Sequence, residues 1–133
     1  MLKLSLFAVM LAIALPVSAQ RTFEYKDGDS VYVMKEYFMV FLKNGPMRDS
    51  IDAEIAKTTQ PKHLEYLGGL YKKGLIVLNG PYGDNGDLRG MSLYAVTSAE
   101  EAVRLASEDP LVKLGWLAVE VHPWWGAIGT CLK

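Results

Sequence analysis

"EYFMVFLKNGP", residues 36–46, is an apolar run that ends in a strong turn signal. Tyr37 to Leu42 are apolar without interruption, and Asn44-Gly45-Pro46 then stops the run. A short apolar run bounded by turn residues is typical of a β-strand that is buried on both faces. The sheet that contains this strand therefore needs a cover on each side.

A helical pattern follows the strand over residues 48–74. Asp49 or Ser50 can cap its start, because a short polar side chain accepts a hydrogen bond from the first turn. Pro61 predicts a kink or a second start, with the proline in a first helical turn. Beyond it, His63 shares one face of the helix with leucines at helical spacing.

The C-terminal half of this helix contains Gly68 and Gly69. Glycine in a helix costs roughly 1 kcal/mol relative to alanine. Close packing of the helix backbone on a sheet would explain these two residues. Lys72-Lys73-Gly74 is typical of a helix C-terminus, where positive charge and a left-handed glycine are favoured.

The rest of the chain continues to alternate between strands and helices. Apolar runs at residues 75–81 and 89–96 predict a second and a third strand, joined by a polar loop. Ser98 and Glu101 form a capping box that opens a second helix. Residues 116–124 predict a fourth strand, followed by a tail.

The order β-α-β-β-α-β predicts an α+β fold of the ferredoxin-like type. Such a fold has a four-stranded antiparallel sheet with two helices on one face. Tyr37 to Leu42 are apolar on both faces, so the second face needs another cover. A second copy of the chain is the simplest cover, which predicts a homodimer in the form of a dimeric α/β barrel.

Residues 1–19 are expected to be a secretory signal peptide, with a positive start, an apolar core and small residues before the cleavage point. The apolar run is too short to span a bilayer comfortably as an anchor. We therefore expect a secreted or periplasmic protein that has no membrane contact after cleavage. Residues 20–35 are predicted to be a flexible lead-in, and residues 36–133 the folded domain.

Charge and cysteine content exclude several classes of protein. The chain has 14 basic and 15 acidic residues and no run of Lys or Arg, so we expect no nucleic-acid partner. Cys131 is the single cysteine, so it cannot form a disulfide within the chain, and its role is left open. Stability must come from the apolar core, from a partner subunit, or from both.

Five short motifs follow one another along the chain. They are H-L-x-x-L from His63, G-P at residues 80–81, G-D-L-R-G at residues 86–90, E-D-P at residues 108–110 and H-P-W at residues 122–124. This ordered set, over about residues 36 to 130, resembles the YciI-like (YCII-related) domain family. The resemblance implies a dimeric ferredoxin-like barrel whose active site is built around a His–Asp pair. It also implies acid–base chemistry on a small molecule, since one branch of the family eliminates chloride from chlorinated hydroxyquinols.

His63 and Asp109 match the family pair and are the candidate catalytic residues. Imidazole titrates near neutrality, and a carboxylate on its second nitrogen fixes the tautomer. We expect His63 to act as general base and Asp109 to orient it, with no cofactor. The alternative is a histidine in water at the edge of a helix and an aspartate that only ends one.

The loop "GDNGDLRG", residues 83–90, supplies further candidates. Asn85-Gly86 is a strong hairpin turn signal, but it does not explain Asp84, Asp87 and Arg89 together. Arg89 can pair with either aspartate, or offer its planar fork to an anionic or phenolic ligand. We predict all three charged residues to be substrate-binding. A calcium loop is disfavoured, because the closing acidic position is occupied by an alanine.

His122 is a further substrate-binding candidate. With His63 it makes only two histidines, and no neighbouring cysteine completes a zinc set. A metal site that uses both histidines and an aspartate is the alternative, but we predict no metal.

Three functional interpretations follow. The first is acid–base catalysis on a small molecule, which requires His63 and Asp109 within hydrogen-bond reach in a pocket. The second is a non-catalytic module that binds or senses a small ligand, which requires the pocket but not the pair. The third is a structural dimer, which requires neither.

Overall fold

The computed structural model describes residues 19–132, which form one antiparallel sheet and three helices. In chain order the elements are β1 (Thr22–Asp27), β2 (Ser30–Asn44), α1 (Ala53–Lys72), β3 (Ile76–Pro81), β4 (Leu88–Tyr94), α2 (Ala99–Ser107), α3 (Pro110–Lys113) and β5 (Leu117–Ala127). The expected signal peptide lies outside the described residues, apart from Ala19. Within residues 19–132, no helix is both long enough and apolar enough to cross a membrane.

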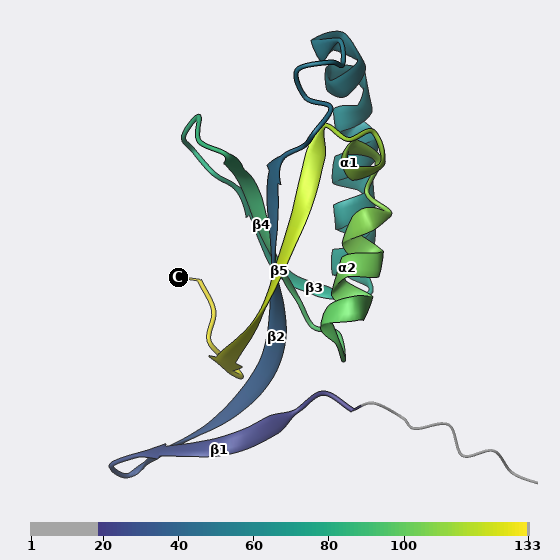
Figure 1. Ribbon diagram of the computed structural model, residues 1–133. Helices are drawn as coiled ribbons and strands as arrows, with labels where there is room; N and C mark the ends of the chain where they lie inside the picture. Colours follow the sequence, from purple (N-terminus) through teal and green to yellow (C-terminus); the bar gives the residue numbers. More distant parts are fainter. Residues whose placement is uncertain (1–18, 133) are drawn as a thin grey trace, which may run out of the picture.

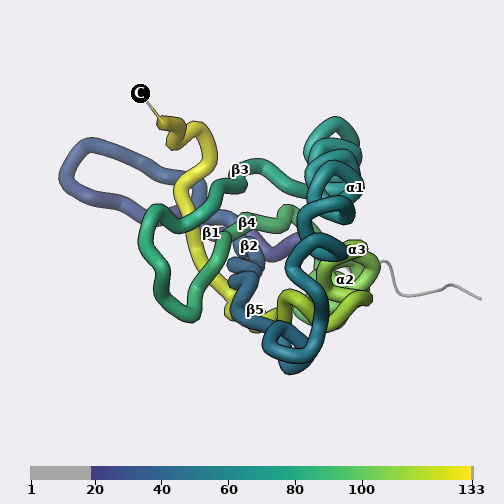
Figure 2. Tube along the Cα trace, turned by 90° about the horizontal axis from the view of Figure 1, so that it is seen from above, coloured from purple at the N-terminus to yellow at the C-terminus, as the bar shows by residue number. Residues whose placement is uncertain are grey.

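The sheet confirms the predicted ferredoxin-like plan. β2 pairs with β4 on one side and with β5 on the other, and β3 pairs with β4, which gives the order β3-β4-β2-β5. Both long helices lie on one side of this sheet, as Figures 1 and 2 show from two directions. The α+β fold class inferred from the sequence is therefore correct.

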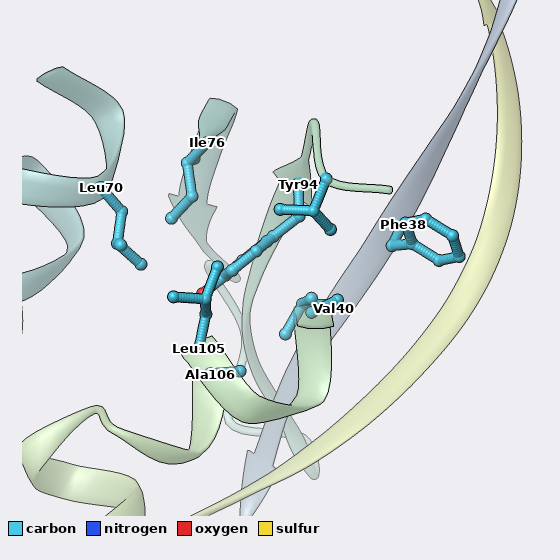
Figure 3. Close-up of a cluster of buried hydrophobic side chains, with 9 residues drawn as sticks. Phe38, Val40, Leu70, Ile76, Tyr94, Leu105 and Ala106 are labelled. Atoms are coloured by element: carbon cyan, nitrogen blue, oxygen red, sulfur yellow. The ribbon is translucent and has the colours of Figure 1, made fainter. Parts of the chain in front are cut away.

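The core forms where the helices meet the sheet. Phe38 and Val40 on β2 point toward the helices, because side chains alternate along a strand. They pack with Ile76 of β3, Tyr94 of β4 and Leu70 of α1, and α2 closes the cluster (Figure 3).

The opposite face of the sheet is uncovered in this chain. Tyr37 and Trp124 lie side by side on it, with ring centroids 6.2 Å apart, and so do Phe41 and His122, at 5.9 Å. Figure 1 shows no element over this face within the described residues. The homodimer that would cover it stays a prediction.

The N-terminal segment differs from the expected flexible lead-in. β1 and the first residues of β2 form a hairpin that projects beyond the helices (Figure 1), with Gly28 at a φ of 56° in its turn. The polar composition of residues 20–35 suggested an irregular chain. The segment in fact alternates polar residues with aromatic ones such as Phe23 and Tyr25, which is typical of a strand. The sheet therefore has five strands rather than four.

Helix α1 also differs from the prediction at its start and at its proline. Asp52 is the N-cap and accepts a hydrogen bond from the Glu54 backbone N–H, so neither Asp49 nor Ser50 has this role. The helix runs without a second start through Pro61. The predicted C-terminal signal is confirmed, because Gly74 has a φ of 72° and ends the helix.

Gly69 in α1 provides a test of the packing around this helix. A Cβ atom at Gly68 or Gly69 would meet no heavy atom within 4 Å, so the expected close contact with the sheet is wrong. Gly69→Ala should raise the free energy of unfolding by about 0.5–1 kcal/mol, because alanine is the better helix former. Urea denaturation measures the change. Gly74→Ala is the control and should destabilise, since Gly74 has a positive φ.

Candidate active site

His63 and Asp109 are in direct contact, although they are distant in the sequence. His63 lies on the inner face of α1, and Asp109 lies between α2 and α3. The Nδ1 atom of His63 is 2.6 Å from Oδ2 of Asp109. The two residues are only 7% and 1% exposed. The structure thus brings together the two residues predicted to form the catalytic pair.

Asp109 is held in place from its other oxygen. Its Oδ1 atom accepts a hydrogen bond of 2.8 Å from the backbone N–H of Leu111, which makes Asp109 the N-cap of α3. An ionised carboxylate only accepts hydrogen bonds, so Nδ1 of His63 must carry the hydrogen that joins the pair. In the neutral imidazole, Nε2 then has a free lone pair.

Nε2 of His63 faces a cavity of about 650 Å³ between α1 and the β3–β4 hairpin. His63 lines this cavity but Asp109 does not, so the ring edge that carries Nδ1 points away from it. Within residues 19–132, no buried side-chain nitrogen or oxygen lacks a hydrogen-bond partner. Nε2, which forms no hydrogen bond in that part of the chain, is therefore accessible from the cavity.

Arg89 lines the same cavity because of an irregularity in β4. Leu42 pairs with Gly90 and Lys43 with Leu88, so Arg89 is the extra residue of a β-bulge. Its Nη1 atom donates to the backbone oxygens of Asp84 and Gly86, at 3.4 and 3.2 Å. The bulge changes the direction of the side chain, and the two carbonyls hold it.

Asp84 and Asp87 do not line the cavity of this subunit, so their substrate-binding role stays a prediction. Asp84 accepts from the backbone N–H of Gly86, and Asp87 forms an ion pair of 3.6 Å with Lys43. The loop is also wider than the predicted tight turn, because Asn85 and Gly86 lack the positive φ values of a two-residue hairpin. In this subunit, both aspartates belong to the loop whose backbone oxygens hold Arg89.

His122 is also excluded from the cavity. It is exposed on the uncovered face of the sheet, where its Nε2 atom is 2.7 Å from Glu120. The hydrogen bond from His122, together with Lys43, lowers the pKa of the Glu120 carboxyl. The Glu120 carboxylate in turn raises the pKa of Lys43. His63 and His122 lie on opposite faces of the sheet, so they cannot share a metal ion within one subunit.

Two tyrosines near the pair are poor candidates for a catalytic base. Burial raises the pKa of both Tyr66 and Tyr94 above the ordinary value of a phenol. The Tyr66 hydroxyl donates to the backbone oxygen of Leu105 at 2.8 Å. The candidate base at this cavity is therefore the imidazole of His63, whose Nε2 atom forms no hydrogen bond among the described residues.

Several cavity residues were not predicted from the sequence. Arg48 comes from the β2–α1 connection and Trp116 from the neighbouring α3–β5 connection, and Gln60 and Tyr82 complete the polar part of the wall. None of them belongs to a recognisable motif. Only the folded chain brings them to the same cavity.

Comparison with known proteins identifies the family. The model of the YCII-related domain matches residues 37–125, which is well over half of the chain.

The chain belongs to the YCII-related domain family.

This family assignment confirms the resemblance seen in the sequence motifs. A similar solved structure is the 5-chloro-2-hydroxyhydroquinone dehydrochlorinase (TftG) from Burkholderia phenoliruptrix AC1100, in complex with 2,5-dihydroxybenzoquinone. It is 25% identical, with a TM-score of 0.51, and the alignment covers 66% of this chain and 92% of that chain. A search of curated proteins found no match. The β1 strand and the last residues of β5 lie outside the matched family segment.

Proposed function

We propose that this YCII-related protein catalyses acid–base chemistry on a small organic molecule without a cofactor. One observation carries the proposal: the buried contact of 2.6 Å between His63 Nδ1 and Asp109 Oδ2, which directs Nε2 into the cavity. A structural dimer would need neither the pair nor the cavity. A binding module would not need a histidine held in one tautomer.

The proposed reaction uses three groups of the chain. Nε2 of His63 takes a proton from a hydroxyl or C–H group of the substrate, and the imidazolium then donates that proton to another atom of the substrate or to a leaving group. Asp109 keeps the ring oriented and stabilises the imidazolium. Arg89 binds the negative charge that the substrate carries while the proton is on His63.

The dehydrochlorinase relative supports this class of chemistry. It acts on 5-chloro-2-hydroxyhydroquinone, as its name states, and its structure holds 2,5-dihydroxybenzoquinone. These are small planar molecules with several oxygens, a size that a cavity of about 650 Å³ accommodates. Hydroxylated aromatic compounds are therefore the first substrates to test.

Proton exchange with solvent tests the proposal directly. The protein is incubated in D2O with 5-chloro-2-hydroxyhydroquinone and with chlorine-free hydroxylated benzenes, and ring deuterium and released chloride are measured. We expect one or both above the uncatalysed rate. His63→Asn is the matched variant, because an amide N–H can still donate to Asp109 but cannot take the proton.

Equal rates for wild type and His63→Asn across this panel would contradict the catalytic proposal. Binding of these compounds without exchange would then favour the non-catalytic module, which uses the same cavity. Thermal melts of both proteins check that the variant keeps the fold.

A further inference from the structure

We propose that Arg48 is a second anion-binding residue of the cavity, and that the substrate is a planar oxyanion before it reacts. The shared chemistry is a carboxylate or an ionised enol or phenol on a small ring. This role for Arg48 rests on the proposed function, because it takes the same cavity as the site of the reaction.

Arg48 lies in the connection between β2 and α1 and reaches the cavity beside Trp116. The guanidinium carbon of Arg48 is 4.5 Å from the centroid of a Trp116 ring. A guanidinium group over an aromatic ring can stack on it with one face, which leaves its N–H groups free to donate in its own plane. A stacked guanidinium can therefore bind a carboxylate or a similar planar anion through two parallel hydrogen bonds.

Hydrogen bonds between backbones fix the segment that carries Arg48. The N–H of Gly45 donates to the oxygen of Trp116 at 2.9 Å, and the N–H of Met47 donates to the oxygen of Gly115 at 3.0 Å. The N–H of Arg48 closes the turn by donating to Gly45 at 3.2 Å. Arg48 and Trp116 therefore belong to two segments that are joined directly, which orders this wall before any ligand binds.

The charged side chains of the cavity wall are basic rather than acidic. Arg48, Arg89 and His63 line it, and none of the residues that line it is an aspartate or a glutamate. In the part of the chain that the structure describes, neither arginine forms an ion pair with a carboxylate. The Asp109 charge lies behind His63 and is bonded to it. A small anion is thus the ligand that matches this wall.

Two guanidinium groups are more than a neutral substrate requires. When His63 removes a proton from a neutral molecule, one negative charge develops, and Arg89 alone can stabilise it. When the substrate is already an anion, deprotonation adds a second charge. Arg48 then binds the resident charge and Arg89 the developing one, so that the doubly charged species is stabilised in the cavity.

Binding measurements at low salt test this role without any need for turnover. The carboxylate probe is benzoate with benzamide as its neutral counterpart, and the enol probe is 2,5-dihydroxybenzoquinone with hydroquinone as its counterpart. We expect at least one anion to bind more tightly than its neutral counterpart. We expect Arg48→Gln to weaken that binding about tenfold or more, from the loss of charge-assisted hydrogen bonds.

Arg104→Gln is the control, because it removes the same charge from an exposed position of α2 that does not line the cavity. Arg48→Lys keeps the charge but loses the planar fork, and should bind the anion with intermediate affinity. Thermal melts identify any variant whose fold is lost, and Arg48→Lys then replaces Arg48→Gln in the comparison. Comparison of the enol probe with the carboxylate probe shows which of these two kinds of oxyanion the cavity binds.

Equal losses of anion affinity in Arg48→Gln and Arg104→Gln would overturn the role of Arg48. Neutral probes that bind as tightly as the anions would also overturn it. Failure of the proposed function would give a different result: the protein would catalyse no proton exchange, but it would still bind the anions through Arg48. His63→Asn separates the two further, since it should retain Arg48-dependent binding while exchange is lost.

Discussion

Asp109→Asn is expected to lower the rate of His63-dependent proton exchange by about 10²–10⁴-fold while the fold is retained. Asparagine keeps an oxygen that can accept the N–H of Leu111, and it is as good an N-cap as aspartate. The amide NH2 group then points at His63, so Nδ1 must become the acceptor and Nε2 must carry the hydrogen. Nε2 of His63 then carries a hydrogen and cannot act as the base, although the packing is unchanged.

Nitrogen-15 NMR of the histidine ring checks this explanation, because it reports which ring nitrogen carries the hydrogen. We expect the hydrogen on Nδ1 in the wild type and on Nε2 in Asp109→Asn. A purely structural role of Asp109 would change stability but not the tautomer. Asp29→Asn is the matched control, since Asp29 is exposed in the turn between β1 and β2 and does not line the cavity. If Asp109→Asn catalysed proton exchange at the wild-type rate, the proposed positioning role of Asp109 would be wrong.

Gly45→Ala is expected to destabilise the protein by about 3 kcal/mol, near the upper end for overpacking. A Cβ atom at Gly45 would lie 2.1 Å from the backbone oxygen of Gly115 and 2.7 Å from the backbone nitrogen of Leu117. Both obstacles are backbone atoms, which cannot rotate away as a side chain can. The new methyl group must therefore separate the start of β5 from the end of β2.

Chemical denaturation measures this loss, and the melting temperature should fall by roughly 10 °C or more. Gly83→Ala is the control, because a Cβ atom there would meet no heavy atom within 4 Å. A Gly45→Ala protein as stable as Gly83→Ala would show that the two segments can separate without cost. The same substitution should also weaken anion binding, since Gly45 donates to Trp116 beside Arg48.

The order and type of the central elements could be predicted because they depend on local patterns. A few neighbouring residues are enough to identify each of three features: the apolar run of β2, the Ser98 cap of α2 and the glycine after α1. Ser98 accepts from the N–H of Glu101 as the capping box requires. Strand β1 is harder to predict, because its residues are mostly polar and only the alternation of Phe23 and Tyr25 with polar residues indicates a strand.

The candidate site was only partly predictable. His63 and Asp109 followed from the family resemblance, since no spacing relates residues that meet only in three dimensions. The placement of Arg89 depends on a bulge, which is a property of strand register and has no local signal here. The face of His122 could be predicted: Val119 and Val121 pack toward the helices, so the alternation along β5 places His122 on the other face.

The central position of β2 has a consequence for the order in which the protein can form during synthesis. One side of β2 bonds to β1 and β4, but Met34 to Asn44 on the other side bond to β5, the last of the described strands. A growing polypeptide on the ribosome therefore exposes an apolar strand with an open edge until residue 127 has emerged. Such an edge readily joins other chains. Newly made molecules are thus most vulnerable to misassembly before β5 has emerged, and a nonsense mutation ahead of β5 should yield aggregates rather than a smaller folded domain.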